Sequence, residues 1–284
     1  MPEPIVMSDG HGLPYSKGLM AQSLSATGLP LERAFELARA VEQRLAAGGV
    51  EQIGAAELCD LTEQVLLVEE GEPSLRRFRH LRRLDRLERP LVVLIGGTTG
   101  VGKSTVSTML AARLGITPVI ATDVIRQVLR AFFTHEAMPS VHRSAFEAGG
   151  VEGYGEQAGQ VATGIAAIMQ RAADEAKPVV VEGVHVVPGM LAGELRARCL
   201  IVETLVVVSD AELHRGHFTH RRGARPPERY LQRFNDIRRL QDHLAERARA
   251  EGVAVIDNEN VDDTLARLMQ LVLDTVGRIG EEQH

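Results

Sequence analysis

Eight consecutive residues, from Gly97 to Ser104, have the types and spacing needed to bind the phosphates of a nucleotide. They match the P-loop pattern G-x-x-x-x-G-K-[ST] at every fixed position. Glycines let backbone N–H groups approach phosphate oxygens, and the start of a following helix adds partial positive charge. The pattern predicts that Lys103 reaches the β- and γ-phosphates and that the Ser104 hydroxyl binds Mg²⁺. The expected nucleotide-binding residues are Gly97, Thr98, Thr99, Gly100, Val101, Gly102, Lys103, Ser104 and Thr105.

Several classes of P-loop protein are excluded by what the sequence lacks. It has no NKxD-like motif of the kind that reads guanine in GTPases, and no LSGGQ-like signature of transport ATPases. A chain of 284 residues is also too short for a large motor protein. A small-molecule kinase that uses ATP and Mg²⁺ is the class that fits.

Two carboxylates follow apolar runs that read as buried strands. Because ligands of open α/β sheets bind beyond the carboxyl ends of the strands, both belong near the phosphates. Asp123 is predicted to orient or deprotonate an acceptor hydroxyl, or to hold magnesium through water; the alternative is a simple helix N-cap. Glu182 is predicted to lie beside the metal, and its alternative is a structural ion pair.

Basic side chains near these carboxylates could bind an acidic acceptor. Arg126 and Arg130 lie one helical turn apart after Asp123, on the face expected to look toward the site. Arg126 could form a bidentate contact with a carboxylate or phosphate. Arg143 lies in a glycine-rich loop and His185 follows Glu182. We predict substrate contacts for all of these residues, against the alternative of solvated or packed side chains.

The densest basic stretch of the second half runs from His214 to Arg229. It follows the fourth apolar run, where small-molecule kinases carry a mobile lid, and arginines there would neutralise charge on the transferred phosphoryl group. We expect one or two of Arg221, Arg222 and Arg225 to be catalytic. Three histidines spaced three apart also suggest zinc, but no fourth ligand is evident and the lid interpretation is favoured. They are His214, His217 and His220.

Short apolar runs alternate with longer helical segments from residue 91 onward. Apolar strands that alternate with helices indicate a parallel sheet covered on both faces. The sequence therefore predicts an α/β kinase domain with a five-stranded parallel sheet of the nucleoside-monophosphate-kinase type, spanning 90–284. The expected strands are 91–95, 118–121, 179–181, 200–208 and 253–256.

The first 89 residues read as a separate, mostly helical domain after a short extended start. An apolar stripe with helical spacing runs from Leu31 through Phe35 to Leu45, with Leu37 at its margin. Further helices are expected at 55–69 and at 74–89, where Pro90 stops the last one.

Composition narrows the partners and the compartment. There are 32 basic and 38 acidic residues and no tryptophan, which argues against nucleic acid as a partner. No run approaches the roughly 18 apolar residues of a membrane span, and the first residues do not read as a secretory signal. Cys59 and Cys199 lie far apart in the sequence, and neither belongs to a CxxC pair. A disulfide framework is therefore not expected, and a reducing cytoplasm is. The sequence leaves a homo-oligomer open.

Six segments together resemble the 2-phosphoglycerate kinase family. In the first domain, GLPYSKGLMAQSLSATGLPLERAFELARAVEQRL resembles the short ATP-cone-like domain of that family, and the similarity extends over about 8–275. The segments of the second domain are LIGGTTGVGKSTVSTMLAARLGI, VIATDVIRQVLR, VVVEGVHVVPG, and HFTHRR with RYLQRFNDIRRLQDHL.

The resemblance implies that ATP phosphorylates the 3-hydroxyl of 2-phosphoglycerate, giving 2,3-bisphosphoglycerate and ADP. It also implies that Lys17 is the phosphate contact of the ATP-cone-like domain. Two alternatives stay open at this point. One is a kinase for another small phosphorylated or carboxylated metabolite, and the other is a nucleotide-sensing regulatory protein that transfers little phosphate. ATP turnover stimulated by an acceptor would separate a kinase from a regulator.

Overall fold

The computed structural model describes residues 4–8, 11–84, 87–147, 150–190, 193–219 and 227–282. The chain groups into two compact units, one of Leu87–Leu268 and one of Met1–Arg86 with Met269–His284. The sequence-based boundary near residue 89 lies close to the first division. The sequence-based assignment of the last residues to the kinase domain differs from this grouping, which places them with the N-terminal unit.

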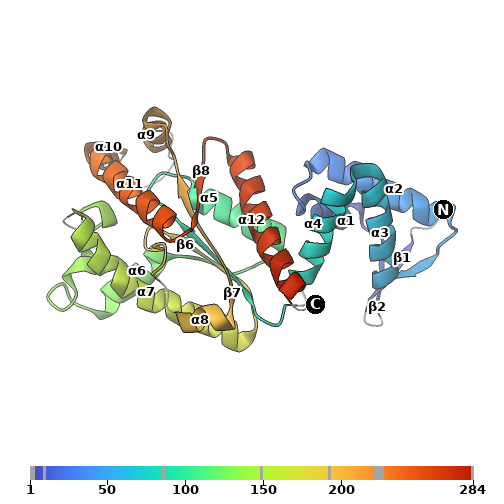
Figure 1. The fold of residues 1–284 in the computed structure, drawn as a ribbon, viewed down its shortest axis with the longest axis horizontal. Coiled ribbons are helices and arrows are strands. Elements are labelled where there is room, and N and C mark those ends of the chain that lie inside the picture. The colour runs from blue at the N-terminus through green and yellow to red at the C-terminus, as the bar shows by residue number, and fades with distance from the viewer. Residues whose placement is uncertain are drawn as a thin grey trace. The chain divides into compact units, whose positions relative to one another are not determined.

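The larger unit is built on a five-stranded, all-parallel sheet with strand order β5-β6-β4-β7-β8 (Figure 1). The predicted α/β class is confirmed, and each of the five expected strands is present. The continuous apolar character of the central strands β4 and β6 follows from burial on both faces, which leaves no solvated side for polar residues. The strands are β4 (Leu91–Gly96), β5 (Val119–Ala121), β6 (Val179–Gly183), β7 (Leu200–Val207) and β8 (Ala254–Asp257).

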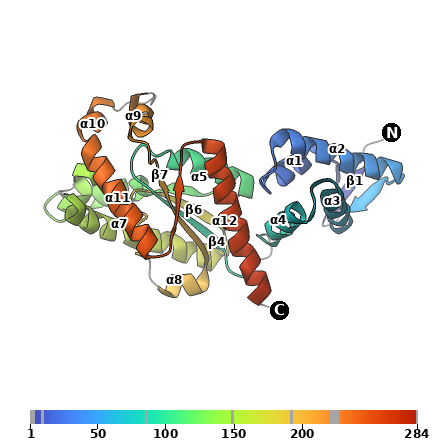
Figure 2. The ribbon, with the colours of Figure 1, turned by 45° about the horizontal axis from the view of Figure 1, so that its top comes forward.

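Helices cover this sheet on both sides (Figure 2). Val92 and Leu94 of β4 pack in one buried cluster with Ile165 of α7 (Gly150–Glu175). Because side chains alternate along a strand, Val93 and Ile95 point to the opposite face, where α5 contacts β4 and β6. The other elements of this unit are α5 (Lys103–Leu114), α6 (Thr122–Phe132), η2 (Pro139–His142), η3 (Ala145–Glu147), α8 (Gly193–Arg198), α9 (Ala211–Thr219), α10 (Pro227–Gln232), α11 (Phe234–Ala250) and the start of α12 (Val261–Glu282).

The smaller unit combines helices with a three-stranded sheet of order β2-β1-β3. The sequence indicated only a short extended start, and the third strand escaped it because three residues are too few to show an alternating pattern. The elements are β1 (Ile5–Ser8), β2 (His11–Pro14), α1 (Lys17–Ser25), α2 (Leu31–Ala47), β3 (Gln52–Gly54), α3 (Ala55–Glu70) and α4 (Glu72–Arg83).

Two helical details of this unit differ from expectation. In α2 the buried stripe is rotated, so that Leu37 is buried while Leu31 and Phe35 are 60% and 39% exposed. Helix α4 begins at Glu72 and has Pro73 in its first turn. Proline is tolerated there because the N–H groups of the first turn have no partner within the helix, so its missing N–H costs no hydrogen bond. It ends at Arg83, so the expected continuation to residue 89 was wrong. Among the described residues, no helix combines the length and apolarity required to cross a membrane.

Candidate active site

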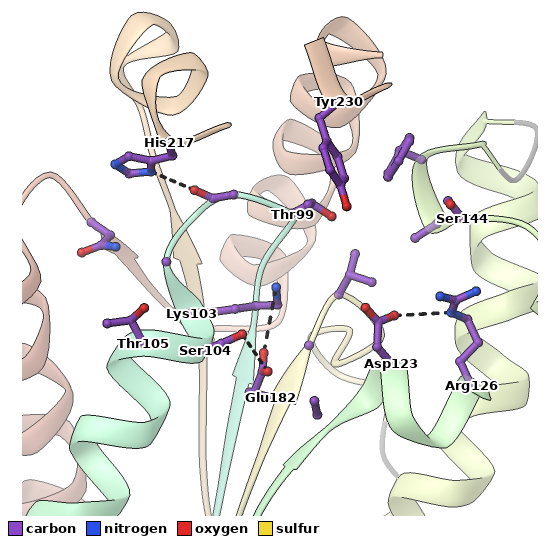
Figure 3. Close-up of a pocket in the computed structure, with 18 of the residues that line it drawn as sticks. Thr99, Lys103, Ser104, Thr105, Asp123, Arg126, Ser144, Glu182, His217 and Tyr230 are labelled. Carbon is purple, nitrogen blue, oxygen red and sulfur yellow. Dashed lines mark hydrogen bonds and ion pairs between the residues drawn. The ribbon is translucent and has the colours of Figure 1, made fainter. Parts of the chain in front are cut away.

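The P-loop connects β4 to α5 and folds over the start of that helix (Figure 3). Its three glycines all have positive φ, with values of 147° at Gly97, 87° at Gly100 and 82° at Gly102. Side chains are disfavoured in this region, and a Cβ at Gly100 would also lie 2.5 Å from the ring of Phe218. The local sequence therefore fixes a turn that other residues cannot adopt without strain.

Three side chains from distant segments hold the outer surface of this loop. Asn258, which follows β8, donates from Nδ2 to the carbonyl of Val101 at 2.8 Å. His214 Nε2 donates to the carbonyl of Thr99 at 2.9 Å, and His217 Nδ1 donates to that of Gly100 at 2.8 Å. These bonds hold the three carbonyls away from the side of the loop where the N–H groups would bind phosphate.

The two histidines therefore contact the phosphate loop through His214 Nε2 and His217 Nδ1. Among the described residues, no group of three or more His, Cys, Asp or Glu side chains could hold a metal ion. His220, the third histidine of the sequence pattern, lies outside the described residues. Sequence reasoning missed Asn258, whose only local signal was a polar residue at the end of a strand.

Replacing Asn258 by alanine should loosen the loop. Asn258 is 3% exposed, and its Oδ1 accepts a bond from Thr264 at 2.8 Å. The change removes the side-chain donor of the Val101 carbonyl and leaves the Thr264 hydroxyl with only its longer bond, of 3.4 Å, to the carbonyl of Asp257. We expect a stability loss of about 1–3 kcal/mol and a weaker affinity for Mg–ATP by roughly tenfold. Urea unfolding and calorimetric titration would measure both. Asn235→Ala, at an exposed position of α11, is the matched control, and equal effects in the two variants would contradict the assignment.

Glu182 lies next to the first turn of α5. It is 5% exposed, and its Oε1 accepts a 2.8 Å bond from the Ser104 hydroxyl. Its Oε2 has no hydrogen-bond partner within the described part of the chain, and Lys103 Nζ lies 3.9 Å away. A buried carboxylate with an unpaired oxygen is costly, and an adjacent hydroxyl completes a set of hard oxygen donors. The two side chains therefore fit a Mg²⁺ ion.

A cavity of about 460 Å³ opens above these residues, within the size range of small-molecule sites. Its walls come from the P-loop, the ends of β5 and β6, η3, α9, α10 and the segment between β8 and α12. Of the predicted nucleotide-binding residues, those lining it are Thr99, Gly100, Gly102, Lys103, Ser104 and Thr105.

Asp123 and Arg126 line the same cavity from α6 (Figure 3). The Asp123 side chain is 60% exposed, and its Oδ1 lies 3.4 Å from Arg126 Nε. Arg126 is largely buried, and its Nη1 donates to the carbonyls of Val141 and Arg143 at 3.2 and 3.1 Å. Arg126 thus also fastens the segment that follows α6, while Asp123 presents its carboxylate to the cavity.

The other predicted substrate residues lie elsewhere. Arg130 and Arg143 are exposed and are not among the described residues that line the cavity. Arg143 contributes its backbone carbonyl rather than its guanidinium to the structure around Arg126. His185 is completely buried behind the cavity wall. The lid arginines Arg221, Arg222 and Arg225 lie outside the described residues.

His185 belongs to a buried chain of hydrogen bonds. Its Nδ1 lies 3.0 Å from Thr122 Oγ1, and its Nε2 lies 2.9 Å from Gln157 Oε1. Because the Gln157 amide nitrogen donates to backbone carbonyls, including Arg143 O at 3.0 Å, its oxygen must accept from His185. Nε2 therefore carries a proton, and in the neutral ring Thr122 donates to Nδ1. Burial, with a smaller opposing effect of Asp123, lowers the pKa of His185 to about 4.

This buried histidine should make stability depend on pH. Its pKa is lower in the folded protein than in the unfolded chain, so unfolding takes up a proton, and stability falls as pH drops from about 6.5 toward 4. Between pH 7 and 4.5 we expect His185 to account for a loss of about 2–3 kcal/mol. Urea unfolding at both pH values should show a smaller loss in His185→Gln, and identical losses would contradict a buried neutral histidine.

Sequence comparisons place these features among known proteins. A family model described as Zeta toxin matches residues 78–265. The 2-phosphoglycerate kinase of Methanopyrus kandleri is 34% identical over 282 residues, which cover 94% of this chain and 86% of that protein. The 2-phosphoglycerate kinase of Pyrococcus horikoshii is 34% identical over 281 residues, covering 95% and 93%.

Proposed function

This chain belongs to the 2-phosphoglycerate kinase family of ATP-dependent phosphotransferases, and on that premise we propose that it phosphorylates the 3-hydroxyl of 2-phosphoglycerate, giving 2,3-bisphosphoglycerate and ADP. The observation that carries the proposal is the arrangement of one cavity. Lys103 and the Ser104–Glu182 pair lie on its phosphate-binding side, and Asp123 faces it from the neighbouring helix.

The nucleotide side would hold ATP through the P-loop backbone and Lys103. The Lys103 ammonium lies 3.4 Å from the carbonyl of Thr98, close to the loop whose N–H groups would bind the phosphates. Ser104 and Glu182 would hold Mg²⁺, which would neutralise charge on the phosphate oxygens when bound. Thr105 and Asn258 complete this wall of the cavity.

The acceptor side would orient the hydroxyl that attacks. Asp123 is the carboxylate placed to accept the hydroxyl proton, and Arg126 beside it would attract an anionic group of the acceptor. For the lid arginines Arg221, Arg222 and Arg225 we keep the proposal that one or two neutralise the transferred phosphoryl group. Positioning and charge neutralisation, rather than a covalent intermediate, would supply the rate.

Two further proposals concern the rest of the chain. Residues 1–89 would form an ATP-cone-like domain, in which Lys17 would contact phosphate; in this structure Lys17 Nζ lies 3.2 Å from Glu42 Oε1. The two cysteines, Cys59 and Cys199, are free, which suits a reducing cytoplasm.

The test is ADP release from Mg–ATP with 2-phosphoglycerate, 3-phosphoglycerate, glycerate or no acceptor, with the product identified by phosphorus NMR. Strong stimulation by 2-phosphoglycerate and a bisphosphoglycerate product are the expected result. Stimulation by another acid alone would replace the acceptor and keep the kinase. Tight ATP binding with no stimulation by any acid would favour a nucleotide-sensing regulator.

A further inference from the structure

An ion pair at the edge of the cavity joins α10 to η3. Arg229 donates from Nε to Glu147 Oε1 at 3.2 Å and from Nη2 to Glu147 Oε2 at 2.7 Å. The same Nη2 donates to the Ser144 hydroxyl at 2.8 Å. A guanidinium that holds both oxygens of a carboxylate, with a hydroxyl beside them, has the geometry that recognises carboxylate and phosphate ligands.

The two partners of this pair face different spaces. Arg229 and Ser144 line the active-site cavity, whereas Glu147 lines an adjacent hollow of about 450 Å³. The side chains of Arg229 and Glu147 are 49% and 28% exposed, so neither is locked in place by packing. The guanidinium therefore lies where an anion in the cavity could replace Glu147.

The balance of charged side chains around the cavity means that such a replacement would help an anionic acceptor to bind. Among the described lining residues, three are basic and three are acidic: Lys103, Arg126 and Arg229 against Asp123, Glu182 and Glu259. Lys103 belongs to the phosphate loop, and Arg126 already gives Nη1 to two carbonyls. An acidic acceptor thus meets little uncompensated positive charge from the described residues until Arg229 leaves Glu147.

The backbone around Arg229 is held independently of this ion pair. The neighbouring Tyr230 ring stacks on Phe218 at 5.2 Å, and Phe218 stacks on His214 at 5.4 Å. His214 in turn donates to the P-loop carbonyl of Thr99. Because this aromatic stack anchors α10 to the phosphate loop, Arg229 can exchange partners by rotating its side chain alone.

We propose that Glu147 occupies, in the acceptor-free enzyme, the place of the acceptor's anionic group on Arg229 and Ser144. Binding of an acceptor that carries a carboxylate or phosphate near its hydroxyl exchanges one anion for another on the same guanidinium. Arg229 is then a binding residue for the acceptor, and Glu147 is a competitor that sets the acceptor's KM. This inference rests on the proposed function, since it assumes an acidic acceptor in this cavity.

Four proteins test the exchange: the wild type, Glu147→Gln, Arg229→Ala and the double variant. Each is assayed at saturating Mg–ATP over a range of 2-phosphoglycerate concentrations, which gives kcat and the acceptor's KM. An ion pair of this exposure shifts an equilibrium by up to about fivefold, so Glu147→Gln should lower KM by up to that factor, with the effect in KM rather than kcat. Arg229→Ala should raise KM by roughly 10- to 100-fold. In the Arg229→Ala background, Glu147→Gln should change nothing.

The double variant separates a competitor from a mere negative charge. If Glu147→Gln leaves KM unchanged or raises it, or lowers KM equally with and without Arg229, the exchange is refuted. Arg233→Ala is the control and should leave KM unchanged. Arg233 pairs with Asp236 at 3.4 Å, and it lines the adjacent hollow but not the active-site cavity.

Failure of the proposed function would be visible separately, as a wild type that does not turn over 2-phosphoglycerate. In that case calorimetric titration of the same four proteins with inorganic phosphate, which carries the charge but not the hydroxyl, tests the exchange alone. The exchange is supported if Glu147→Gln binds phosphate more tightly than the wild type and if Arg229→Ala and the double variant bind it equally weakly. Equal affinities in all four proteins refute the exchange.

Discussion

Lys103→Ala should lower acceptor-stimulated ATP turnover by on the order of 10³-fold while the protein stays folded. Lys103 is the described P-loop side chain that carries positive charge into the cavity, where its Nζ lies 3.9 Å from Glu182 Oε2. Alanine removes the charge that would stabilise the β- and γ-phosphates in the transition state. Steady-state ADP release, with circular dichroism to verify the fold, measures the effect.

A second lysine provides the control for this experiment. Lys177 is 71% exposed and pairs with Glu175 at 3.4 Å, away from the cavity, so Lys177→Ala should retain full turnover. Turnover by Lys103→Ala comparable with that of Lys177→Ala would refute the assignment of the P-loop as the catalytic phosphate site.

Asp123→Asn should lower kcat by on the order of 10²–10³-fold while the affinity for ATP changes by less than about threefold. Asparagine keeps the shape of the side chain and its contact with Arg126, but it cannot accept the proton of the acceptor hydroxyl. The carboxylate is 60% exposed and lies on the acceptor side, so nucleotide binding should be little affected. Single-turnover rates and calorimetric titration with Mg–ATP give the two quantities.

The split between rate and affinity decides the role of Asp123. The N-cap of α6 is Ala121, so Asp123 does not cap the helix. Equal losses in kcat and in ATP affinity would indicate a contribution to the metal site instead of an acceptor role. Asp242→Asn, at an exposed position of α11, is the matched control and should leave both quantities unchanged.

Local sequence determined the sheet and the phosphate loop. The strands are short apolar runs between helical segments, and burial on both faces makes such runs recognisable without knowledge of their neighbours. The loop depends on glycines whose φ values other residues avoid, so its conformation is encoded in consecutive positions such as Gly100 and Gly102. Asp123 and Glu182 could be placed near this loop because Asp123 follows β5 and Glu182 lies at the carboxyl end of β6, in a parallel sheet.

Contacts between segments that are distant in the sequence determined which polar side chains reach the site, and the sequence pattern could not predict them. His214 and Asn258 lie 115 and 157 positions from the loop carbonyls that they bind, and their partners are backbone atoms, which leave no trace in residue types. His185 read as a loop residue near substrate, yet packing places it in a buried chain of hydrogen bonds. Arg229 was one arginine among many until folding placed it beside Glu147, 82 positions away. The chemical groups of the site were visible in the sequence, whereas the choice among similar groups depended on three-dimensional proximity.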